Sequence, residues 1–411
     1  MSQKHVLSGI KVLDFTQYLA GPTTTRLMAE MGAEIIKVEM APMGDPTRGI
    51  AYLRNKRSAY YIQQNRGKKS ISLDMSKPES KEILLELAKQ VDVVMENFSP
   101  GVIGRLGLDW ETVHKINPNA IMCSLSAFGQ TGPLSHLSGF DYIAQAYSGV
   151  TSMIGEPGGQ AYLPMLGIGD VSTGVHALAA INGALFHRER GGGGQHLDIS
   201  LLDAYFHMHE MNVQMISASG GEIQPTRSGS HHFAVAPLGL YQGKDGYIVV
   251  IALGKMWDSL CNAMGRADMI EDPKFATNDA RIENKDELIS IVEGWIQSQE
   301  SDAVAVKLLE DARVPVAPML SVAEAMAHPH LRERRTIREV SDRVFGTVEI
   351  PGMPLKFSQF PDDLDLDTPF LGEYNKEVIG GWLGMSDDEY QKLEDAGVLH
   401  SRPIRIAEAG E

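Results

Sequence analysis

Apolar and polar residues alternate in a series of short segments in the first half of the chain, and this alternation predicts strands. Segments with apolar residues at helical spacing lie between most of these strands. Strands that alternate with helices pair in parallel, so residues 1–218 are expected to form an α/β domain around a parallel sheet. The predicted strands are residues 10–15, 33–39, 70–74, 91–96, 120–125 and 196–200, and a further helix is predicted over residues 201–217.

The composition changes at a serine and glycine cluster around residue 219, which predicts a domain boundary. Residues 239–252 have the pattern of a hairpin, and helical patterns follow, so residues 219–330 are expected to form a smaller α+β domain. Residues 331–346 are highly charged and are interpreted as a linker. Residues 347–411 are expected to form a C-terminal segment that ends in an amphipathic helix.

Asp170 lies between two glycine-containing segments, immediately before an apolar run over residues 175–186 that predicts a buried helix. Gly174 and Gly183 add no side chains to this helix, so a neighbouring element is expected to pack closely against it. The sequence leaves two roles open for Asp170. An aspartate at the start of a helix commonly caps it, whereas a carboxylate beside bare glycine backbone is also suited to act as a nucleophile.

The composition of the 411 residues is that of a globular protein, with 43% hydrophobic and 22% charged residues. The net charge of −16 argues against nucleic acid as a partner, because nucleic-acid binding needs clustered positive charge. No apolar run is long enough to cross a membrane, and no signal peptide is evident, so a cytoplasmic location is expected. Cys123 and Cys261 lie in apolar segments and are expected to be buried thiols.

Two common ligand motifs are missing from the sequence. The first strand is not followed by the glycine fingerprint of dinucleotide-binding enzymes, and there is no phosphate-binding P-loop. The histidine pairs His207/His209 and His231/His232 have spacings that suit metal ligation poorly, so no metal is predicted. Neither a nicotinamide cofactor nor a metal ion is therefore expected from the motifs.

Polar and aromatic residues follow the predicted strand at residues 91–96, at the edge where open α/β sheets bind ligands. Asn97 is suited to bind a polar ligand, Phe98 to stack on a flat ring, and Arg105 to bind a phosphate. The alternative is an ordinary turn between a strand and a helix, with Asn97 as the helix cap.

Eight short motifs, distributed over nearly the whole chain, occur in the order found in one protein family. They are residues 7–15, 20–22, 44–48, 96–101, 139–141, 169–170, 191–199 and 369–373. Each motif is weak alone, but together they make the chain closely resemble the class III CoA-transferases, which include formyl-CoA and carnitine CoA-transferases.

The resemblance implies an enzyme that moves CoA from an acyl-CoA to a carboxylic acid, with coenzyme A as substrate and no permanently bound cofactor. Asp170 matches the family's covalent nucleophile, which would form an anhydride and then an aspartyl-CoA thioester. The positions that match contacts to CoA are Gln17, Tyr18, Leu73, Asn97, Phe98 and Arg105. The positions that match the surroundings of the reacting group are Leu19, Phe140 and Asp141.

The sequence departs from the formyl-CoA branch of the family in two places. Leu19 replaces a glutamine near the oxalate, which argues against oxalate as a substrate. Met40 replaces an arginine near the CoA nucleotide, so phosphate binding is expected to fall on Arg105 and on lysines such as Lys68 and Lys69. The glycine-rich lid of that branch is not evident, and residues 228–231 are the nearest match.

Two other functions remain open. An acyl-CoA racemase of the same fold would need a histidine where Phe140 stands, and phenylalanine cannot transfer a proton. A non-catalytic CoA-binding protein would keep Asn97, Phe98 and Arg105 but would not transfer the acyl group. The resemblance also implies an interlocked homodimer, in which each chain has a Rossmann-like large domain and a small domain and the C-terminal segment, residues 347–411, returns to the large domain. The identities of the two acids are left open.

Overall fold

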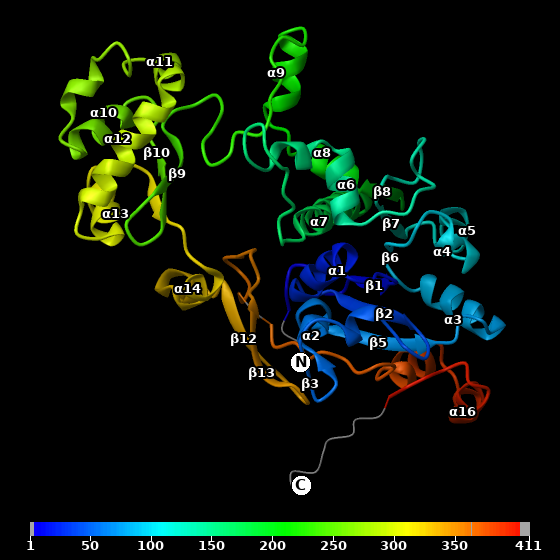
Figure 1. Ribbon diagram of the computed structural model, residues 1–411. Coiled ribbons are helices and arrows are strands. Elements are labelled where there is room, and N and C mark those ends of the chain that lie inside the picture. The colour runs from blue at the N-terminus through cyan, green and yellow to red at the C-terminus, as the bar shows by residue number, and fades with distance from the viewer. Residues whose placement is uncertain (1–3, 363, 403–411) are drawn as a thin grey trace. The chain divides into compact units, whose positions relative to one another are not determined.

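The computed structural model describes residues 4–362 and 364–402, which divide into two compact units. The first unit comprises Met1–Ser148, Met165–Met208 and Pro329–Glu411, and the second comprises Gly149–Pro164 and His209–His328 (Figure 1). In the parts of the chain that the structure describes, no helix is both long enough and apolar enough to cross a membrane.

The first unit is built around a six-stranded sheet in which every neighbouring pair is parallel. The strands are β1 (Lys11–Asp14), β2 (Glu34–Met40), β5 (Lys68–Leu73), β6 (Val93–Glu96), β7 (Ile121–Ser126) and β8 (His196–Ser200). Their spatial order, β5-β2-β1-β6-β7-β8, is the 3-2-1-4-5-6 order of doubly wound Rossmann folds. The predicted α/β class and parallel sheet are therefore confirmed, and the strand order reverses between β1 and β6.

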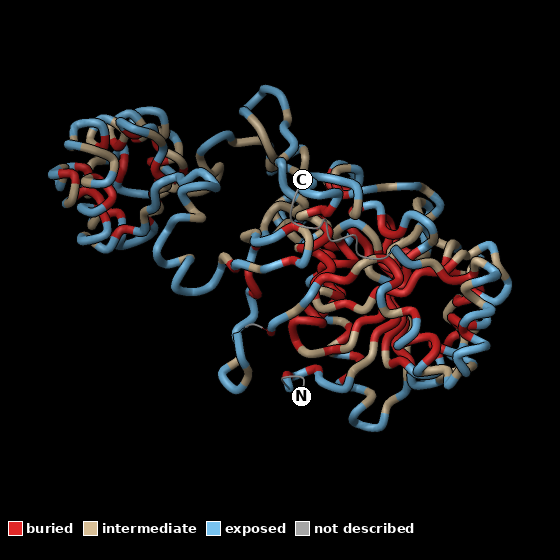
Figure 2. The backbone as a smooth tube through the Cα atoms, turned by 90° about the horizontal axis from the view of Figure 1, so that it is seen from below, coloured by how far each residue is buried: buried red, intermediate tan, exposed pale blue. Residues whose placement is uncertain are grey.

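Helices cover both faces of this sheet, and Figure 2 shows buried backbone concentrated along its strands. On one face a core of buried side chains joins the sheet to α3 (Pro78–Ala88), α5 (Trp110–Ile116) and α16 (Asp387–Asp395). On the other face α1 (Ala20–Glu30) packs against α7 (Ile168–Glu189). The remaining helices of this unit are η1 (Pro46–Gly49), α2 (Ala59–Asn65), α4 (Val102–Arg105), α6 (Asp141–Tyr147), α8 (Leu201–Phe206), α15 (Pro329–Glu333) and the π-helical turn η4 (Lys376–Trp382).

Helix α7 is the predicted apolar helix, but it buries only one face, begins seven residues earlier than residue 175 and includes Asp170. Gly174 lets α1 pack closely, because a Cβ there would lie 2.6 Å from the carbonyl oxygen of Ala20. The Thr24 hydroxyl of α1 donates to the carbonyl oxygen of Gly174 at 2.9 Å. The expected close packing is thus confirmed at Gly174, whereas nothing lies within 4 Å of a Cβ at Gly183.

The single helix predicted over residues 201–217 is wrong. The structure has the short helix α8 and a separate helix α9 (Asn212–Ala218), with turns between them. The chain passes from the first unit to the second at Met208, inside this break. Apolar periodicity continues through both segments, so the break between them is not visible in the sequence pattern.

The second unit contains the predicted hairpin, β9 (Leu238–Gln242) and β10 (Tyr247–Ile251), with β11 (Val316–Pro318) paired along the edge of β10. It begins earlier than residue 219, because residues 149–164 and 209–218 also belong to it. The other elements of this unit are η2 (Val150–Met153), α10 (Met256–Ala263), η3 (Ala267–Ile270), α11 (Asn278–Glu283), α12 (Lys285–Ser298), α13 (Asp302–Asp311) and α14 (Val322–Ala327).

The charged stretch expected to be a linker is structured. It contains β12 (Ile337–Asp342), which pairs antiparallel with β13 (Gly346–Pro351) in the first unit. A second small hairpin there consists of β3 (Leu53–Arg54) and β4 (Arg57–Ser58). The C-terminal segment packs on the large unit as expected, since Leu399 forms a β-bridge with Leu73 and lies in the same core.

Candidate active site

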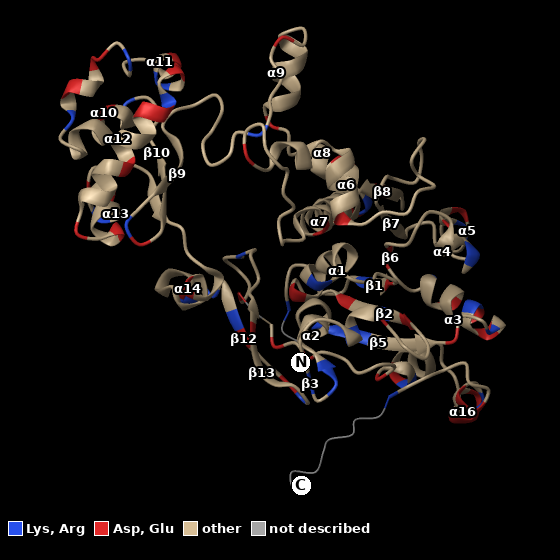
Figure 3. Ribbon diagram, in the orientation of Figure 1, with Lys and Arg blue, Asp and Glu red and all other residues tan. Residues whose placement is uncertain are grey.

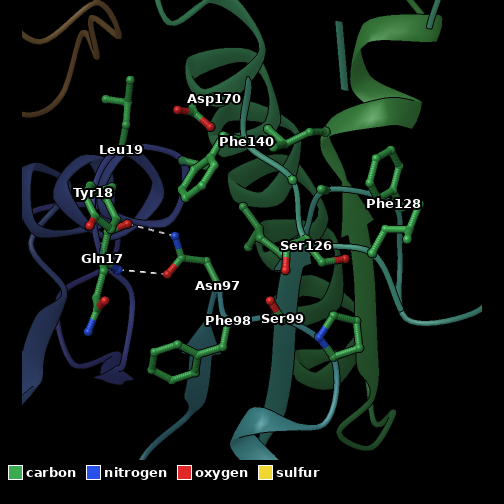
Figure 4. A pocket seen from close by; sticks show the side chains of 18 of the residues that line it. Gln17, Tyr18, Leu19, Asn97, Phe98, Ser99, Ser126, Phe128, Phe140 and Asp170 are labelled. Carbon is green, nitrogen blue, oxygen red and sulfur yellow. Dashed lines mark hydrogen bonds between the residues drawn. The ribbon is translucent and has the colours of Figure 1, made fainter. Parts of the chain in front are cut away.

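A cavity of about 320 Å³ lies at the carboxyl ends of β1, β6 and β7, where the strand order reverses. Open α/β sheets bind their ligands at this point, because the loops after neighbouring strands diverge there. Figure 4 shows the side chains around it. The cavity is lined by Gln17, Tyr18, Leu19, Ala20, Asn97, Phe98, Ser99, Pro100, Leu125, Ser126, Ala127, Phe128, Ser135, Leu137, Ser138, Gly139, Phe140, Asp170 and Leu201.

Asn97 joins the loops that follow β1 and β6 (Figure 4). Its side-chain oxygen accepts a hydrogen bond from the backbone N–H of Gln17, and its side-chain nitrogen donates to the carbonyl oxygen of Gln17, both at 2.8 Å. The next residue, Tyr18, has a left-handed backbone with φ of 64°, a conformation that this two-point clamp helps to maintain. Asn97 is therefore not the helix cap that the sequence left open, and Gly101 holds that position at α4.

Asp170 is the third residue of α7, and the helix cap position is Gly167. The Asp170 backbone N–H donates to Oδ2 of Asp141, the first residue of α6, at 3.1 Å. Among the residues that the structure describes, none donates a hydrogen bond to the Asp170 carboxylate. The capping interpretation of Asp170 is therefore wrong. The Asp141 carboxylate accepts the N–H from the first turn of α7, and the Asp170 carboxylate stays available at the cavity.

The electrostatic environment of Asp170 favours its neutral form. Burial raises the pKa of the Asp170 carboxyl to about 7, and the negative charge of Asp141 contributes in the same direction. Tyr60 of α2 lies close enough to Asp170 for the pKa of its hydroxyl to be affected. Burial, together with the charge of Asp170, raises the pKa of Tyr60 to about 12. A carboxyl that titrates near neutral pH at the edge of a cavity is typical of a functional group.

Apolar side chains form the wall beside Asp170. Leu19 packs over Gly167, where a Cβ would lie 2.4 Å from Cδ2 of Leu19. The exposed rings of Tyr18 and Phe140 meet edge to face, with centroids 6.3 Å apart. Within the described part of the chain, no lysine, arginine or histidine lines the cavity. Polar lining therefore comes from hydroxyls, amides and backbone groups.

Two of the residues predicted to contact CoA do not line the cavity. The Leu73 side chain is fully buried in the core between the sheet and the C-terminal segment. Arg105 ends the short helix α4 and is exposed to solvent. Helix α4 follows directly after Phe98, Ser99 and Pro100, so Arg105 lies outside the cavity on the segment that leads away from it.

The expectation that Lys68 binds phosphate is contradicted, whereas that for Lys69 stays a prediction. The Lys68 ammonium is fully buried, lies 3.1 Å from Oδ2 of Asp14 and donates to Asn65 at 3.0 Å. Burial lowers the pKa of Lys68 to about 8, against the opposing charge of Asp14. Lys69 is paired with Glu34 and Glu377. Figure 3 shows basic positions on β5 beside acidic positions on β2.

Several cavity residues were not predicted from the sequence. Ser126 ends β7, and Ala127 and Phe128 follow it. They form one wall, and Ser138 and Gly139 line the cavity beside them. The predicted strand at residues 120–125 carried a usable signal, because the residues after any parallel strand lie at the same edge of the sheet. Tyr60 does not line the cavity but lies near Asp170, and it had no such signal, since residues 40–66 read as a loop-rich segment in the sequence.

The residues proposed from the sequence as a lid, 228–231, lie in the second unit. There His231 forms a β-bridge with Gly239, and its ring packs edge to face on Tyr241 with centroids 4.9 Å apart. Their role as a lid stays a prediction.

Comparison with known proteins places the chain in a family. The model of CoA-transferase family III matches residues 7–375. A succinate–glutarate CoA-transferase of Agrobacterium fabrum is 36% identical over 395 residues, which cover 92% of this chain and 96% of the relative. A succinyl-CoA:glutarate CoA-transferase of Mus musculus is 32% identical over 404 residues, covering 97% and 91%.

A crystal structure of a CAIB/BAIF family protein from Brucella suis has the same fold. It superimposes with a TM-score of 0.80 at 31% sequence identity, covering 92% of this chain and 100% of that one. The family model matches residues 7–375. The Agrobacterium relative and the Brucella structure each match over more than nine tenths of this chain and of their own length. The chain therefore belongs to CoA-transferase family III.

Proposed function

We propose that this protein transfers CoA from an acyl-CoA thioester to a carboxylic acid through covalent intermediates on Asp170. The observation that carries the proposal is the state of the Asp170 side chain. Its backbone is held by Asp141, its carboxylate receives no hydrogen bond from a described residue, and it faces the cavity at the reversal of strand order. A carboxylate in this setting is available for attack on a bound thioester.

The reaction consists of exchanges between activated acyl groups. The Asp170 carboxylate attacks the thioester carbonyl, which forms a mixed anhydride and releases CoA thiolate. The thiolate attacks the Asp170 carbonyl of the anhydride, which forms an aspartyl-CoA thioester and releases the donor acid. The acceptor carboxylate attacks this thioester, and the departing thiolate then attacks the acceptor's acyl carbonyl, which yields the new acyl-CoA and free Asp170. Exclusion of water keeps each intermediate from hydrolysis.

Backbone amides are the groups best placed to stabilise the tetrahedral oxyanions. Helix α1 has 11 residues and begins at Ala20, which lines the cavity, without a side-chain cap. The first-turn N–H groups of a helix have no acceptor within it and carry partial positive charge. We assign this stabilising role to the N–H groups of Ala20 and Gly21, which compensate for the absence of cationic side chains among the described lining residues.

We assign the parts of CoA to residues in order from the cavity outwards. Gln17, Tyr18 and Asn97 would surround the thioester and pantetheine, Phe98 would contact the pantetheine or adenine, and Arg105 would meet a phosphate outside the cavity. Leu19 gives the acyl group an apolar neighbour and offers no hydrogen bond to an oxalate. Acids with a methylene next to the carboxyl, such as the succinate and glutarate named for the relatives, fit this wall better.

Intact-protein mass spectrometry tests this proposal. The protein is mixed with succinyl-, glutaryl-, acetyl- or oxalyl-CoA, quenched, and split into samples with and without hydroxylamine. We expect an adduct with the mass of CoA or of the acyl group, strongest with a dicarboxylic acyl-CoA and cleaved by hydroxylamine. CoA binding without any adduct would contradict transferase function, and deuterium incorporation at the α-carbon would then indicate a racemase.

Adduct formation is expected to depend on pH in one direction. Because the pKa of Asp170 is raised to about 7, its carboxyl is mostly protonated below pH 6 and mostly ionised above pH 8. Attack requires the ionised form, so the rate of adduct formation at low acyl-CoA should rise through pH 7 and then level off. Rapid-quench mass spectrometry between pH 5 and 9 measures this. A rate that does not vary over that range would contradict the assignment.

We further propose that the active protein is a homodimer. Helix α7 exposes the apolar side chains of Val171, Val175 and Phe186 along its length, although its other face packs on α1. Apolar side chains that recur along one exposed helix face are typical of an interface. Light scattering during turnover is expected to give twice the mass of the chain, and turnover by a monomer would contradict the proposal.

A further inference from the structure

Tyr205 of α8 lies directly beneath the nucleophile's helix. Its side chain is fully buried, and its ring occupies the space where Gly169 has no side chain. A Cβ at Gly169 would lie 2.1 Å from Cε2 of Tyr205. The first turn of α7, which carries Asp170, therefore rests on this ring.

The Tyr205 hydroxyl connects three helices by hydrogen bonds. It donates to Oδ1 of Asp141, and it accepts from Nε2 of Gln145 at 3.1 Å. Gln145 is fully buried and follows Asp141 by four residues on α6, so both side chains lie on one face of that helix. The other oxygen of Asp141 accepts the N–H of Asp170. An unbroken chain of hydrogen bonds thus runs from Gln145 through Tyr205 and Asp141 to Asp170.

We propose that Tyr205 and Gln145 are positioning residues for Asp170, acting through Asp141. The proposal rests on the proposed function of Asp170. A first-turn N–H needs an acceptor, and the cap residue Gly167 has no side chain to offer one. A side chain at residue 167 would collide with Leu19. The acceptor is therefore Asp141 of α6, and Tyr205 of α8 orients it. Together they fix the position of the Asp170 backbone, from which the attacking carboxylate extends.

Tyr205→Phe tests the role of the hydroxyl, because it keeps the ring beside Gly169 and removes the donor to Asp141. We expect adduct formation from acyl-CoA to slow by about tenfold, the effect of losing one hydrogen bond to a charged group. The midpoint of the pH dependence should rise, because the charge of Asp141, no longer shared with the hydroxyl, opposes ionisation of Asp170 more strongly.

Asp141→Asn should move the same midpoint in the opposite direction. It removes the charge that disfavours the ionised form of Asp170 while leaving an oxygen to accept a hydrogen bond. The charged group that acts on this titration is Asp141 from α6. Tyr60 from α2 also faces Asp170, but its pKa is raised to about 12, so it stays neutral between pH 5 and 9. Helix α1 presents Ala20, Gly21 and Pro22 in its first turn, none of which titrates. Opposite shifts in two variants cannot arise from a loss of folded protein.

Tyr241→Phe is the matched control, since Tyr241 is an equally buried tyrosine in the second unit. It should leave the adduct rate and the pH midpoint unchanged. Gln145→Leu should shift the midpoint upward by less than Tyr205→Phe, and it carries the test if Tyr205→Phe does not fold. Wild-type rate and midpoint in both variants would overturn the positioning role. Absence of an adduct in the wild-type protein would instead overturn the proposed function.

Discussion

Asp170→Ala is expected to abolish the covalent adduct and to lower turnover by at least about a thousandfold. Each proposed intermediate contains an acyl bond to the Asp170 carboxylate, and no other carboxylate lines the cavity among the described residues. Asp141 cannot substitute for it, because both of its oxygens are engaged by Tyr205 and by the N–H of Asp170. Intact-mass measurement after mixing with the best donor detects the loss.

Asp170→Asn separates loss of chemistry from loss of structure. The carboxyl has a raised pKa in the folded protein, so its ionised form destabilises the fold as the pH rises above the ordinary aspartate value. The asparagine variant should therefore be at least as stable as the wild type at pH 8, while forming no adduct. A variant that is inactive and also less stable at pH 8 would indicate a structural role for Asp170.

Asp14→Asn is expected to lower the stability of the first unit by about 3–5 kcal/mol, the usual effect of removing one partner from a buried ion pair. Asp14 is fully buried, accepts from the N–H and hydroxyl of Thr16 and from the Thr25 hydroxyl, and lies 3.1 Å from Nζ of Lys68. Burial would raise the pKa of Asp14, but the charges of Lys68 and Lys37 hold it below its ordinary value. The substitution leaves both ammonium groups buried with less compensation.

Hydrogen exchange in peptides covering β1 and β5 measures this loss in the first unit alone. Protection should fall by at least about a hundredfold at pH 7, where each factor of ten corresponds to about 1.4 kcal/mol. The difference in protection between the wild type and Asp14→Asn should shrink above pH 8. Lys68 of the wild type loses its charge there, so its ion pair with Asp14 no longer stabilises the fold. Glu86→Gln, in an exposed pair with Lys89, is the control and should leave exchange unchanged. Unchanged protection in Asp14→Asn would refute the stabilising role of the pair.

The same substitution should also weaken CoA binding. Asp14 holds Thr16 through two hydrogen bonds, and the Lys37 ammonium donates to the carbonyl oxygen of Thr16 at 2.7 Å. Thr16 directly precedes Gln17 and Tyr18, which line the cavity. Asp14 and Lys37 thus fix the loop after β1 through Thr16, and Asn97 fixes it through Gln17.

Local pattern was sufficient to predict the sheet of the first unit and the hairpin of the second. Alternating apolar residues mark β1, β2 and β6, and the helices between them require parallel pairing. The same reasoning failed where burial depends on distant residues. The charged residues of β12 predicted a linker, but Arg338 is buried close to Glu30, a contact that local pattern does not encode.

By itself, the sequence determined the α/β class, the position of Asp170 at the start of an apolar helix, and the edge of the sheet after β6, where the cavity lies. These depend on periodicity and on chain order, which are local properties. It left Asp170 between two roles and left Asn97 as a ligand contact or a cap. Only the tertiary structure excluded the capping role of both residues, because each capping position is settled by a partner from another element.

Asp141 of α6 caps the helix in place of Asp170, and Gln17 of the loop after β1 engages Asn97 from a distance of eighty residues in the chain. Tertiary structure also buried Lys68, which had become a candidate for phosphate binding because Met40 replaces the arginine of the formyl-CoA branch. The physical reason is common to all three cases. Hydrogen bonds and ion pairs take whichever partner the packing of the helices and strands brings within about 3 Å, and the spacing of residues along the chain does not specify that partner.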